Sequence, residues 1–307
     1  AIGGNALSPS GESASVANQF RHTRESLVPI VDLATQGWRI AIVHGNGPQG
    51  GDELLRNQVA RDEVAQLPLG VQVAETAGWI GYMIPQSLHN ALRSAGSERR
   101  VVTVVTQARV EPDDPALASP SKFIGRRLSP EAAEVLRAEG VVVEQDPRGN
   151  LRRRVPSPVP VEIIESDMVR ELVFRGDIVI AAGGGGIPVY EDPSLGLEGV
   201  DAVVDKDRAA AILAREIGAS ILLILTDVDG VYEAWGTDQA RRIPRLTMSE
   251  AARLLEGDAL GAGSMRPKLE AAHHFLETGG DRALIAALDE GPMALLGEAG
   301  TTIESRG

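Results

Sequence analysis

The sequence predicts an α/β fold in which a central sheet is covered by helices on both faces. Short apolar runs and helical patterns alternate from one end of the chain to the other, as they do when strands and helices follow one another. Several of the predicted strands end in glycine-rich turns, where open α/β sheets bind their ligands. At 307 residues the chain has room for one large domain or for two lobes, each with its own core.

In chain order, the apolar runs predict six strands. These strands span residues 39–43, 101–106, 141–144, 177–181, 221–225 and 282–286. Between the strands lie helix start signals at Ser129, Ser166, Asp205, Thr247 and Pro267. Glycines that close four of these helices follow at Gly140, Gly176, Gly218 and Gly279.

Two stretches interrupt this alternation. Residues 111–127 are rich in Pro, Asp and Ser, and residues 145–160 contain several prolines and the triplet Arg152-Arg153-Arg154. Together they bracket a strand and a helix, and they predict a small protruding subdomain at about residues 111–160. The triplet fits either an anion patch or the solvated edge of a hairpin, and we favour the hairpin edge.

Charge and composition narrow the function classes. A net charge of −13 argues against non-specific nucleic-acid binding, which depends on Lys and Arg side chains that neutralise phosphates. No apolar run approaches the roughly 20 residues that span a bilayer, and the first residues carry no secretory signal. The absence of cysteine excludes disulfides, thiol nucleophiles and cysteine-ligated zinc. These features fit a cytoplasmic protein. Because the sequence opens without Met, we expect a few residues upstream of it.

Lysine is used at only three positions. Of the 30 basic residues 27 are arginines, and the lysines are Lys122, Lys206 and Lys268. A lysine ammonium is a compact charge on a flexible stem that can follow a moving phosphoryl group, whereas arginine favours fixed bidentate geometry. A bias toward arginine with three chance survivors is the alternative. The positions of Lys206 and Lys268 at predicted helix starts favour a phosphate site.

Four glycine-rich turns lie at residues 3–5, 44–49, 183–186 and 261–264. Glycine lets the backbone approach a ligand and point its N–H groups at it. One such turn can serve chain geometry alone, but four in one α/β chain indicate a large polyanionic ligand. Residues 45–50 match the dinucleotide pattern G-x-G-x-x-G. However, Pro48 removes a donor, and no second strand ends in an acidic residue about 20 positions later.

Asp205-Lys206-Asp207 opens a predicted helix. There Asp205 can be the N-cap, a site residue or both, and we favour Asp207 as the organiser of the lysines.

Residues 225–232 end a predicted strand in a polar turn. Thr226 and Asp227 could bond a ribose or adenine, and Tyr232 or Trp235 could cover the base. Aspartates that merely build the turn are the alternative, and the nucleotide interpretation is favoured.

The motifs of other catalytic classes are missing. The sequence has no G-x-S-x-G elbow, no H-E-x-x-H motif and no Gly-Lys-Ser/Thr of a P-loop, and His273 and His274 point apart on a helix. Only His44 among the histidines lies in a predicted site, where a hydrogen bond that shapes the loop explains it as well as catalysis does.

With these motifs the chain resembles the carbamate kinases, which belong to the amino-acid kinase fold family. The resemblance follows the family's order over nearly the whole length, at residues 1–7, 44–49, 79–82, 121–125, 154–158, 183–189, 203–207, 225–232 and 264–268. It implies an open three-layer αβα sandwich with a mainly parallel central sheet. It also implies an acyl-substrate lobe over residues 1–176, a nucleotide-binding lobe over residues 177–307, and a homodimer.

The resemblance implies a role for each site residue as well. The catalytic set is Lys122, Lys206, Asp207 and Lys268, with Asp207 orienting the lysines. The phosphoryl group and carbamate would be bound by Gly3, Gly4, Asn5, His44, Gly45, Asn46, Gly47, Gly183, Gly184, Gly185 and Gly186. The nucleotide would be bound by Asp205, Thr226, Asp227, Val228, Tyr232, Gly263, Ser264 and Met265. Mg²⁺ would arrive with ATP or ADP, with no metal site made by the protein alone.

The implied reaction is reversible phosphoryl transfer between ATP and carbamate, a reaction of arginine metabolism. Carbamate is already an anionic oxygen nucleophile, so direct in-line transfer needs positioning and charge neutralisation but no strong base. Two alternatives are another acyl-phosphate-forming kinase of the same fold and a noncatalytic nucleotide sensor. The chain departs from the family pattern at Gly50, at Thr76-Ala77 and at Arg126-Arg127, around the substrate loop and the protruding subdomain.

Overall fold

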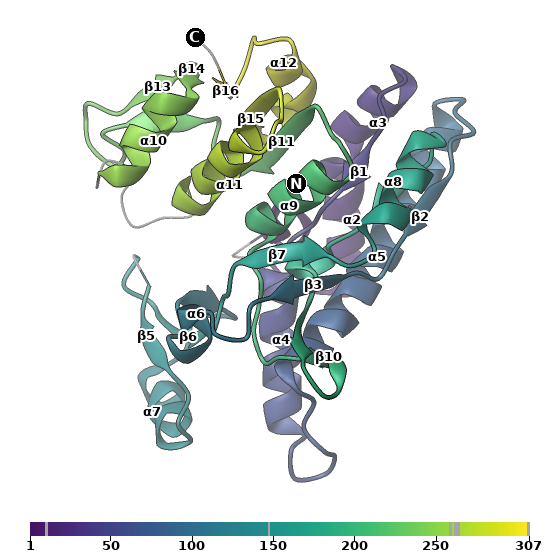
Figure 1. Cartoon of the computed structure of the whole chain (residues 1–307). Helices are drawn as coiled ribbons and strands as arrows, with labels where there is room; N and C mark the ends of the chain where they lie inside the picture. The colour runs from purple at the N-terminus through teal and green to yellow at the C-terminus, as the bar shows by residue number, and fades with distance from the viewer. Residues whose placement is uncertain (10–11, 147, 258–259, 261–264, 306–307) are drawn as a thin grey trace.

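A mainly parallel sheet forms the middle layer of the molecule (Figure 1). This computed structural model describes residues 1–9, 12–146, 148–257, 260 and 265–305. The strands of the sheet are β1 (Ala41–Ile42), β2 (Val101–Thr103), β8 (Ile178–Ile180), β11 (Ile221–Thr226), β14 (Arg245–Thr247), β15 (Arg282–Ala287) and β16 (Thr301–Glu304). They form two groups, β1-β8-β2 and β11-β15-β16-β14, in which only the β15–β16 pair is antiparallel. Ile2 joins the groups because it pairs in parallel with both His44 and Leu225.

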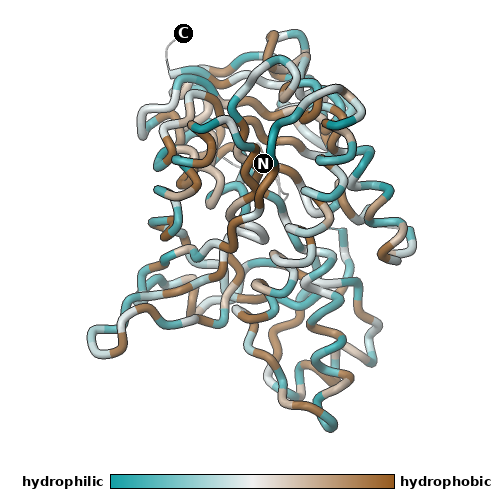
Figure 2. The backbone as a smooth tube through the Cα atoms, turned by 90° about the vertical axis from the view of Figure 1, so that its right-hand side faces the viewer, coloured by the Kyte–Doolittle hydropathy of each residue, from teal (hydrophilic) through white to brown (hydrophobic). Residues whose placement is uncertain are grey.

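Helices cover both faces of this sheet. One face carries α2 (Val16–Ser26), α3 (Val28–Thr35), α5 (Leu69–Ser94) and α12 (Gly291–Leu295). The other face carries α8 (Ser166–Phe174), α9 (Lys206–Glu216), α10 (Met248–Glu256) and α11 (Met265–Glu277). Successive strand residues point to opposite faces, so Ile42 and Ile180 lie in the first core and Val43 and Val179 in the second. Figure 2 shows these hydrophobic segments running past the N-terminus through the centre of the molecule. The predicted three-layer αβα sandwich is confirmed.

All six predicted strands are present, with shifted ends. The predicted strand 101–106 differs most from the structure, because β2 stops at Thr103 and the chain then continues into a second sheet. That sheet has the order β10-β9-β3-β7, built from β3 (Gln107–Val110), β7 (Pro160–Ile163), β9 (Ile187–Asp192) and β10 (Gly196–Gly199). A separate hairpin pairs β12 (Val231–Glu233) with β13 (Arg241–Ile243). The predicted capping box of α10 is present, with the Thr247 hydroxyl accepting from the Glu250 N–H at 3.2 Å.

A small subdomain projects from the corner of the molecule (Figure 1). It contains α6 (Pro115–Ala118), α7 (Pro130–Ala138) and a sheet of order β4-β6-β5, from β4 (Lys122–Ile124), β5 (Val143–Gln145) and β6 (Leu151–Val155). The arginine triplet lies in β6, the middle strand, so its interpretation as a hairpin edge is wrong. Arg154 is instead half-buried, paired with Glu144 and 5.4 Å above the Phe123 ring.

The subdomain meets α4 (Gly47–Val59) through a contact between two backbones. A Cβ added at Gly51 would lie 2.1 Å from the Gly125 Cα, next to β4. Beside this contact Arg126 donates two hydrogen bonds to Asp52, at 2.6 and 2.9 Å. Because no side chain can rotate out of the way, only glycine fits at position 51.

The variant Gly51→Ala is therefore expected to lower the free energy of unfolding by about 1–3 kcal/mol, the usual range for overpacking. Gly50→Ala on the same helix is the matched control. Its Cβ would meet only the Asn46 amide at 3.8 Å, so the better helix propensity of alanine should leave stability equal or slightly higher. Urea unfolding of both variants measures the difference, and equal midpoints would contradict the backbone contact.

Candidate active site

Two glycine turns and a lysine stem meet at the carboxyl ends of β1 and of the Ile2 bridge. Gly3 is the N-cap of the short helix α1 (Gly4–Leu7). A Cβ at Gly45 would lie 2.9 Å from the Gly4 nitrogen and 3.1 Å from Cδ of Lys206. The turn of residues 44–49 therefore packs directly on the glycine turn of residues 3–5, and the Lys206 side chain reaches the contact between these two turns. Asn5 is exposed beside them.

The third turn, Gly183–Gly186, follows β8 and closes the same space. Added Cβ atoms would lie 2.6 Å from the His44 ring at Gly183 and 2.5 Å from the Asn46 amide at Gly184. At Gly185 the Cβ would lie 2.3 Å from the Val204 carbonyl oxygen, and its φ of 101° also favours glycine. The structure thus brings three of the four predicted turns together. Gly263 and Ser264, in the fourth, lie outside the described residues.

Asp207 holds two of the three lysines. It is 2% exposed, its Oδ2 accepts from Nζ of Lys268 at 3.2 Å, and its Oδ1 accepts from Nζ of Lys206. Burial alone would raise the pKa of Asp207, but the charges of Lys206 and Lys268 outweigh burial and hold that pKa below its usual value. Burial is also the main reason why the pKa of Lys206 is lowered. Two ammonium groups are thereby fixed at the edge of the glycine turns.

Lys122 is paired with a different carboxylate. Its Nζ donates to Oδ2 of Asp205 at 2.6 Å, which connects β4 of the subdomain to the start of α9. The prediction that Asp207 orients all three lysines is thus wrong for Lys122. Asp205 is also the N-cap of α9, accepting from the N–H groups of Asp207 and Arg208 at 2.9 and 3.4 Å. Burial would raise the pKa of Asp205, but Lys122 and Lys206 keep it far below its usual value.

His44 is fully buried between the turns. Its Nδ1 lies 3.2 Å from the Gly45 carbonyl oxygen. Since a carbonyl can only accept, Nδ1 carries the proton, and Nε2 has no hydrogen-bond partner among the described residues. Burial lowers the pKa of His44 to about 4. His44 is therefore neutral at physiological pH, and its observed contact is the hydrogen bond within the loop.

This lowered pKa predicts that acid destabilises the protein through His44. The unfolded chain, with a histidine pKa near 6.5, binds more protons than the folded one between about pH 4 and 6.5, so stability falls as pH falls through that window. The expected loss between pH 7 and pH 5 is about 2 kcal/mol. His44→Asn keeps a donor near Nδ1 but cannot titrate, so this part of the loss should vanish. Urea unfolding of wild type and variant at pH 7 and pH 5 measures this loss of stability. The same pH dependence in both proteins would contradict the role of His44.

Asn46 is oriented by a residue to which the sequence analysis gave no role. Its Nδ2 donates to the Thr76 hydroxyl at 2.8 Å, and Thr76 is fully buried in α5. The hydroxyl in turn donates within the helix, to the carbonyl oxygen of Val73 or Gln72 at 2.9 or 3.1 Å. The departure of Thr76-Ala77 from the family pattern was the only sequence signal at this position.

Four of the predicted nucleotide residues, Thr226, Asp227, Val228 and Tyr232, lie at the end of β11 or shortly after it. Thr226 is buried and donates to Asp227 at 3.1 Å. The Tyr232 hydroxyl donates to Asp229 at 2.8 Å, which is the main reason why the pKa of Tyr232 is raised. Trp235 stands edge-on to the Tyr232 ring at 5.0 Å between centroids. Val228 lies in the same turn, and Met265 begins α11, three residues before Lys268.

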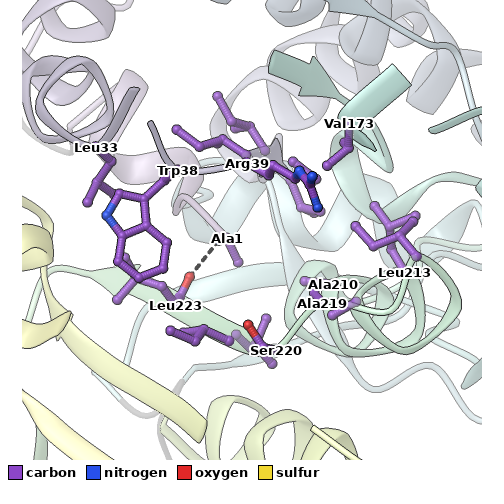
Figure 3. A pocket seen from close by; sticks show the side chains of 18 of the residues that line it. Ala1, Leu33, Trp38, Arg39, Val173, Ala210, Leu213, Ala219, Ser220 and Leu223 are labelled. Atoms are coloured by element: carbon purple, nitrogen blue, oxygen red, sulfur yellow. Dashed lines mark hydrogen bonds between the residues drawn. The ribbon is translucent and has the colours of Figure 1, made fainter. Parts of the chain in front are cut away.

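A separate cavity of about 470 Å³ opens beside Ala1, between the amino-terminal parts of β1 and β11 (Figure 3). Its lining is mainly apolar, with Leu33, Val173 and Leu213 around it and the Arg39 guanidinium 4.7 Å above the Phe174 ring. Such a lining does not suit phosphate. The polar groups that suit phosphate gather at the other ends of these strands.

Comparison with known proteins gives one consistent result. Residues 1–287 match the model of the Amino acid kinase family. The chain is 41% identical to the carbamate kinase of Pyrococcus furiosus over 99% of this chain and 97% of that protein. It is 46% identical to that of Escherichia coli, with the same coverage. The solved structure of the Giardia lamblia carbamate kinase bound to citric acid superposes with a TM-score of 0.92 at 33% identity, covering 99% of this chain and 96% of that one. The same enzyme bound to AMP-PNP gives 0.89.

Proposed function

The chain belongs to the amino acid kinase family, and we propose that it is a carbamate kinase, which transfers a phosphoryl group between ATP and carbamate. The observation that carries this proposal is the pairing of Lys206 and Lys268 on one buried aspartate beside three glycine turns. Lys122 adds a third ammonium through Asp205. Three cations against two carboxylates leave an excess of positive charge beside the first turn of α1, which suits a phosphoryl group in transfer.

The proposed chemistry follows from these groups. The phosphoryl group passes in line between the ADP oxygen and the carbamate oxygen, and charge collects on its three outer oxygens. Lys206 and Lys268 neutralise this charge, and the N–H groups of Gly3, Gly4 and Asn5 position it. Carbamate is held by residues 45–47 and 183–186 and needs no base, which agrees with a neutral, buried His44. The nucleotide phosphates would bind Mg²⁺, which would supply further positive charge to the transferred group. Among the described residues, no group of three or more His, Asp or Glu side chains could hold a metal ion.

The proposed division of labour places the acyl substrate mainly in residues 1–176, with the turn of residues 183–186 added from the second part, and the nucleotide in residues 177–307. This division is supported by the turn of residues 44–49 in the first part and by the segment Thr226–Tyr232 in the second.

We place the enzyme in the cytoplasm, where ATP and ADP are available. Among the described helices, none has the length and apolar character needed to cross a bilayer.

The decisive experiment is ATP formation from ADP, Mg²⁺ and carbamoyl phosphate, with acetyl phosphate as the comparison substrate. We expect turnover with carbamoyl phosphate at a kcat/KM at least tenfold above that with acetyl phosphate. Turnover only with acetyl phosphate or another acyl phosphate would favour a different acid kinase of the same fold. Binding of ADP without turnover of any acyl phosphate would favour the noncatalytic sensor.

The proposed homodimer is supported by exposed apolar side chains on neighbouring elements. Tyr82 on α5 and Val105 after β2 are 58% and 56% exposed, and the two elements touch where the Thr103 hydroxyl donates to Gly81. We expect Tyr82→Lys to shift the mass measured by light scattering from dimer toward monomer, with Val59→Lys, a change of another exposed apolar side chain on α4, as the control. A monomeric wild-type protein would contradict this proposal.

A further inference from the structure

The turn that follows β8 is held at both ends by one residue, Thr106. The Thr106 hydroxyl accepts a hydrogen bond from the Ala182 N–H at 2.7 Å. The Thr106 carbonyl oxygen accepts another from the Ile187 N–H at 2.9 Å. Thr106 is itself buried, in the short connection between β2 and β3. Its two hydrogen bonds therefore enclose the whole glycine turn of residues 183–186.

The first of these bonds acts on a strained residue. Ala182 has φ 48° and ψ 39°, the left-handed conformation that a residue with a Cβ adopts at a cost. It is fully buried, so an N–H without an acceptor could not turn to water instead. A backbone that relaxed toward a right-handed conformation would change the direction in which the chain enters Gly183. The Thr106 hydroxyl opposes that change.

The turn has little room to move without disturbing the site. Gly184 lies against the Asn46 amide, and its N–H donates to the His44 carbonyl oxygen at 2.8 Å. Gly185 lies against the carbonyl oxygen of Val204, which directly precedes Asp205. A displacement of this turn would therefore also displace the turn of residues 44–49 on one side and the start of α9 on the other.

We propose that Thr106 is a positioning residue for phosphoryl transfer, because it clamps the glycine turn of residues 183–186 in its strained conformation against Asn46 and α9. Thr106 contacts the turn and not the reacting groups, so its effect on the reaction is indirect. This inference rests on the proposed carbamate kinase function, but the clamp itself can be tested without turnover.

The test compares two threonine-to-valine variants. Thr106→Val keeps the shape and removes the acceptor. The matched control is Thr103→Val in β2, since the Thr103 hydroxyl donates to the Gly81 carbonyl oxygen, which lacks its helical donor because Pro85 has no N–H. Both variants leave one backbone group unpaired, but only Thr106 touches the turn. We expect Thr106→Val to lower kcat by about 10- to 100-fold, the range for a small misplacement of reacting groups, and to raise the KM for carbamoyl phosphate. The KM for ADP should change less than about twofold, and Thr103→Val should keep both constants near wild type.

Two further variants distinguish positioning of the glycine turn from a non-specific loss of folded structure. Thr106→Ser restores the hydroxyl and should recover most of the activity. Ala182→Gly in the Thr106→Val background removes the penalty of the left-handed conformation, so kcat should rise several-fold over Thr106→Val alone. No gain in that double variant would overturn the clamp, because the hydroxyl would then act through something other than Ala182.

Amide hydrogen exchange tests the clamp independently of catalysis. Peptides covering residues 181–187 should exchange faster in Thr106→Val than in wild type or Thr103→Val. If wild-type protein does not turn over carbamoyl phosphate, the proposed function fails while this exchange result still decides whether the clamp exists. Equal exchange, or equal losses of activity in both valine variants, would overturn the role of Thr106.

Discussion

Replacing Lys206 with alanine is expected to lower kcat for ATP formation from carbamoyl phosphate by a hundredfold or more. The expectation follows from its place in the molecule: Nζ is fixed by Asp207, and the side-chain stem lies against Gly45. A cation that is held in advance where charge develops lowers the barrier without reorganisation, and the loss of one such group has this magnitude. The KM for ADP should change much less than kcat, because the cation acts mainly in the transition state.

Arg208→Ala is the matched control for this result. Arg208 lies two residues further along α9 and pairs with Glu270 at 2.8 Å, with about a third of its side chain exposed. Both variants remove one positive charge from the same helix, but only Lys206 faces the glycine turns. A loss in Lys206→Ala no larger than that in Arg208→Ala would show that net charge, and not the placed ammonium, supports the reaction.

The sequence predicted the layers of the fold and most of the site because their signals are local. Buried strands such as β11 and β15 are continuous apolar runs, and glycines that a ligand or a close contact requires stand in visible clusters. Lys206 and Lys268 were found because lysine is rare in this chain. In the subdomain the apolar run 141–144 predicted β5, but β4 and β6 were missed because β4 has only three residues and β6 is rich in arginine.

Residues that act through a single hydrogen bond had no comparable signal. Thr76 and Thr106 are ordinary threonines in the sequence, and only the packing of α5 and of the β2–β3 connection near the turns shows what their hydroxyls bind. The sequence also did not show which aspartate binds which lysine. In the sequence Asp205 and Asp207 flank Lys206, but Asp205 at the N-cap pairs with Lys122, whereas Asp207 pairs with Lys206 and Lys268. Such pairs depend on side-chain directions that residue spacing does not fix.

Asp207→Ala is expected to have the second largest effect, on stability as well as on activity. The variant removes the carboxylate between two buried ammonium groups, and breaking a buried pair in this way costs about 3–5 kcal/mol. Asp207→Asn, which keeps the shape without the charge, should lose less stability than the alanine variant but a similar share of kcat.

The pH dependence of Asp207→Ala distinguishes lost charge compensation from lost packing. Without the carboxylate, burial and mutual repulsion lower the pKa of Lys206 further below its unfolded value, so the folded variant binds fewer protons than the unfolded chain at alkaline pH. Its stability should then rise as pH increases from 7 to 9, more steeply than that of the wild type. Urea unfolding at the two pH values measures this slope. A destabilised variant with the wild-type slope would mean that Asp207 supports the site by packing, and that the two lysines do not depend on its charge.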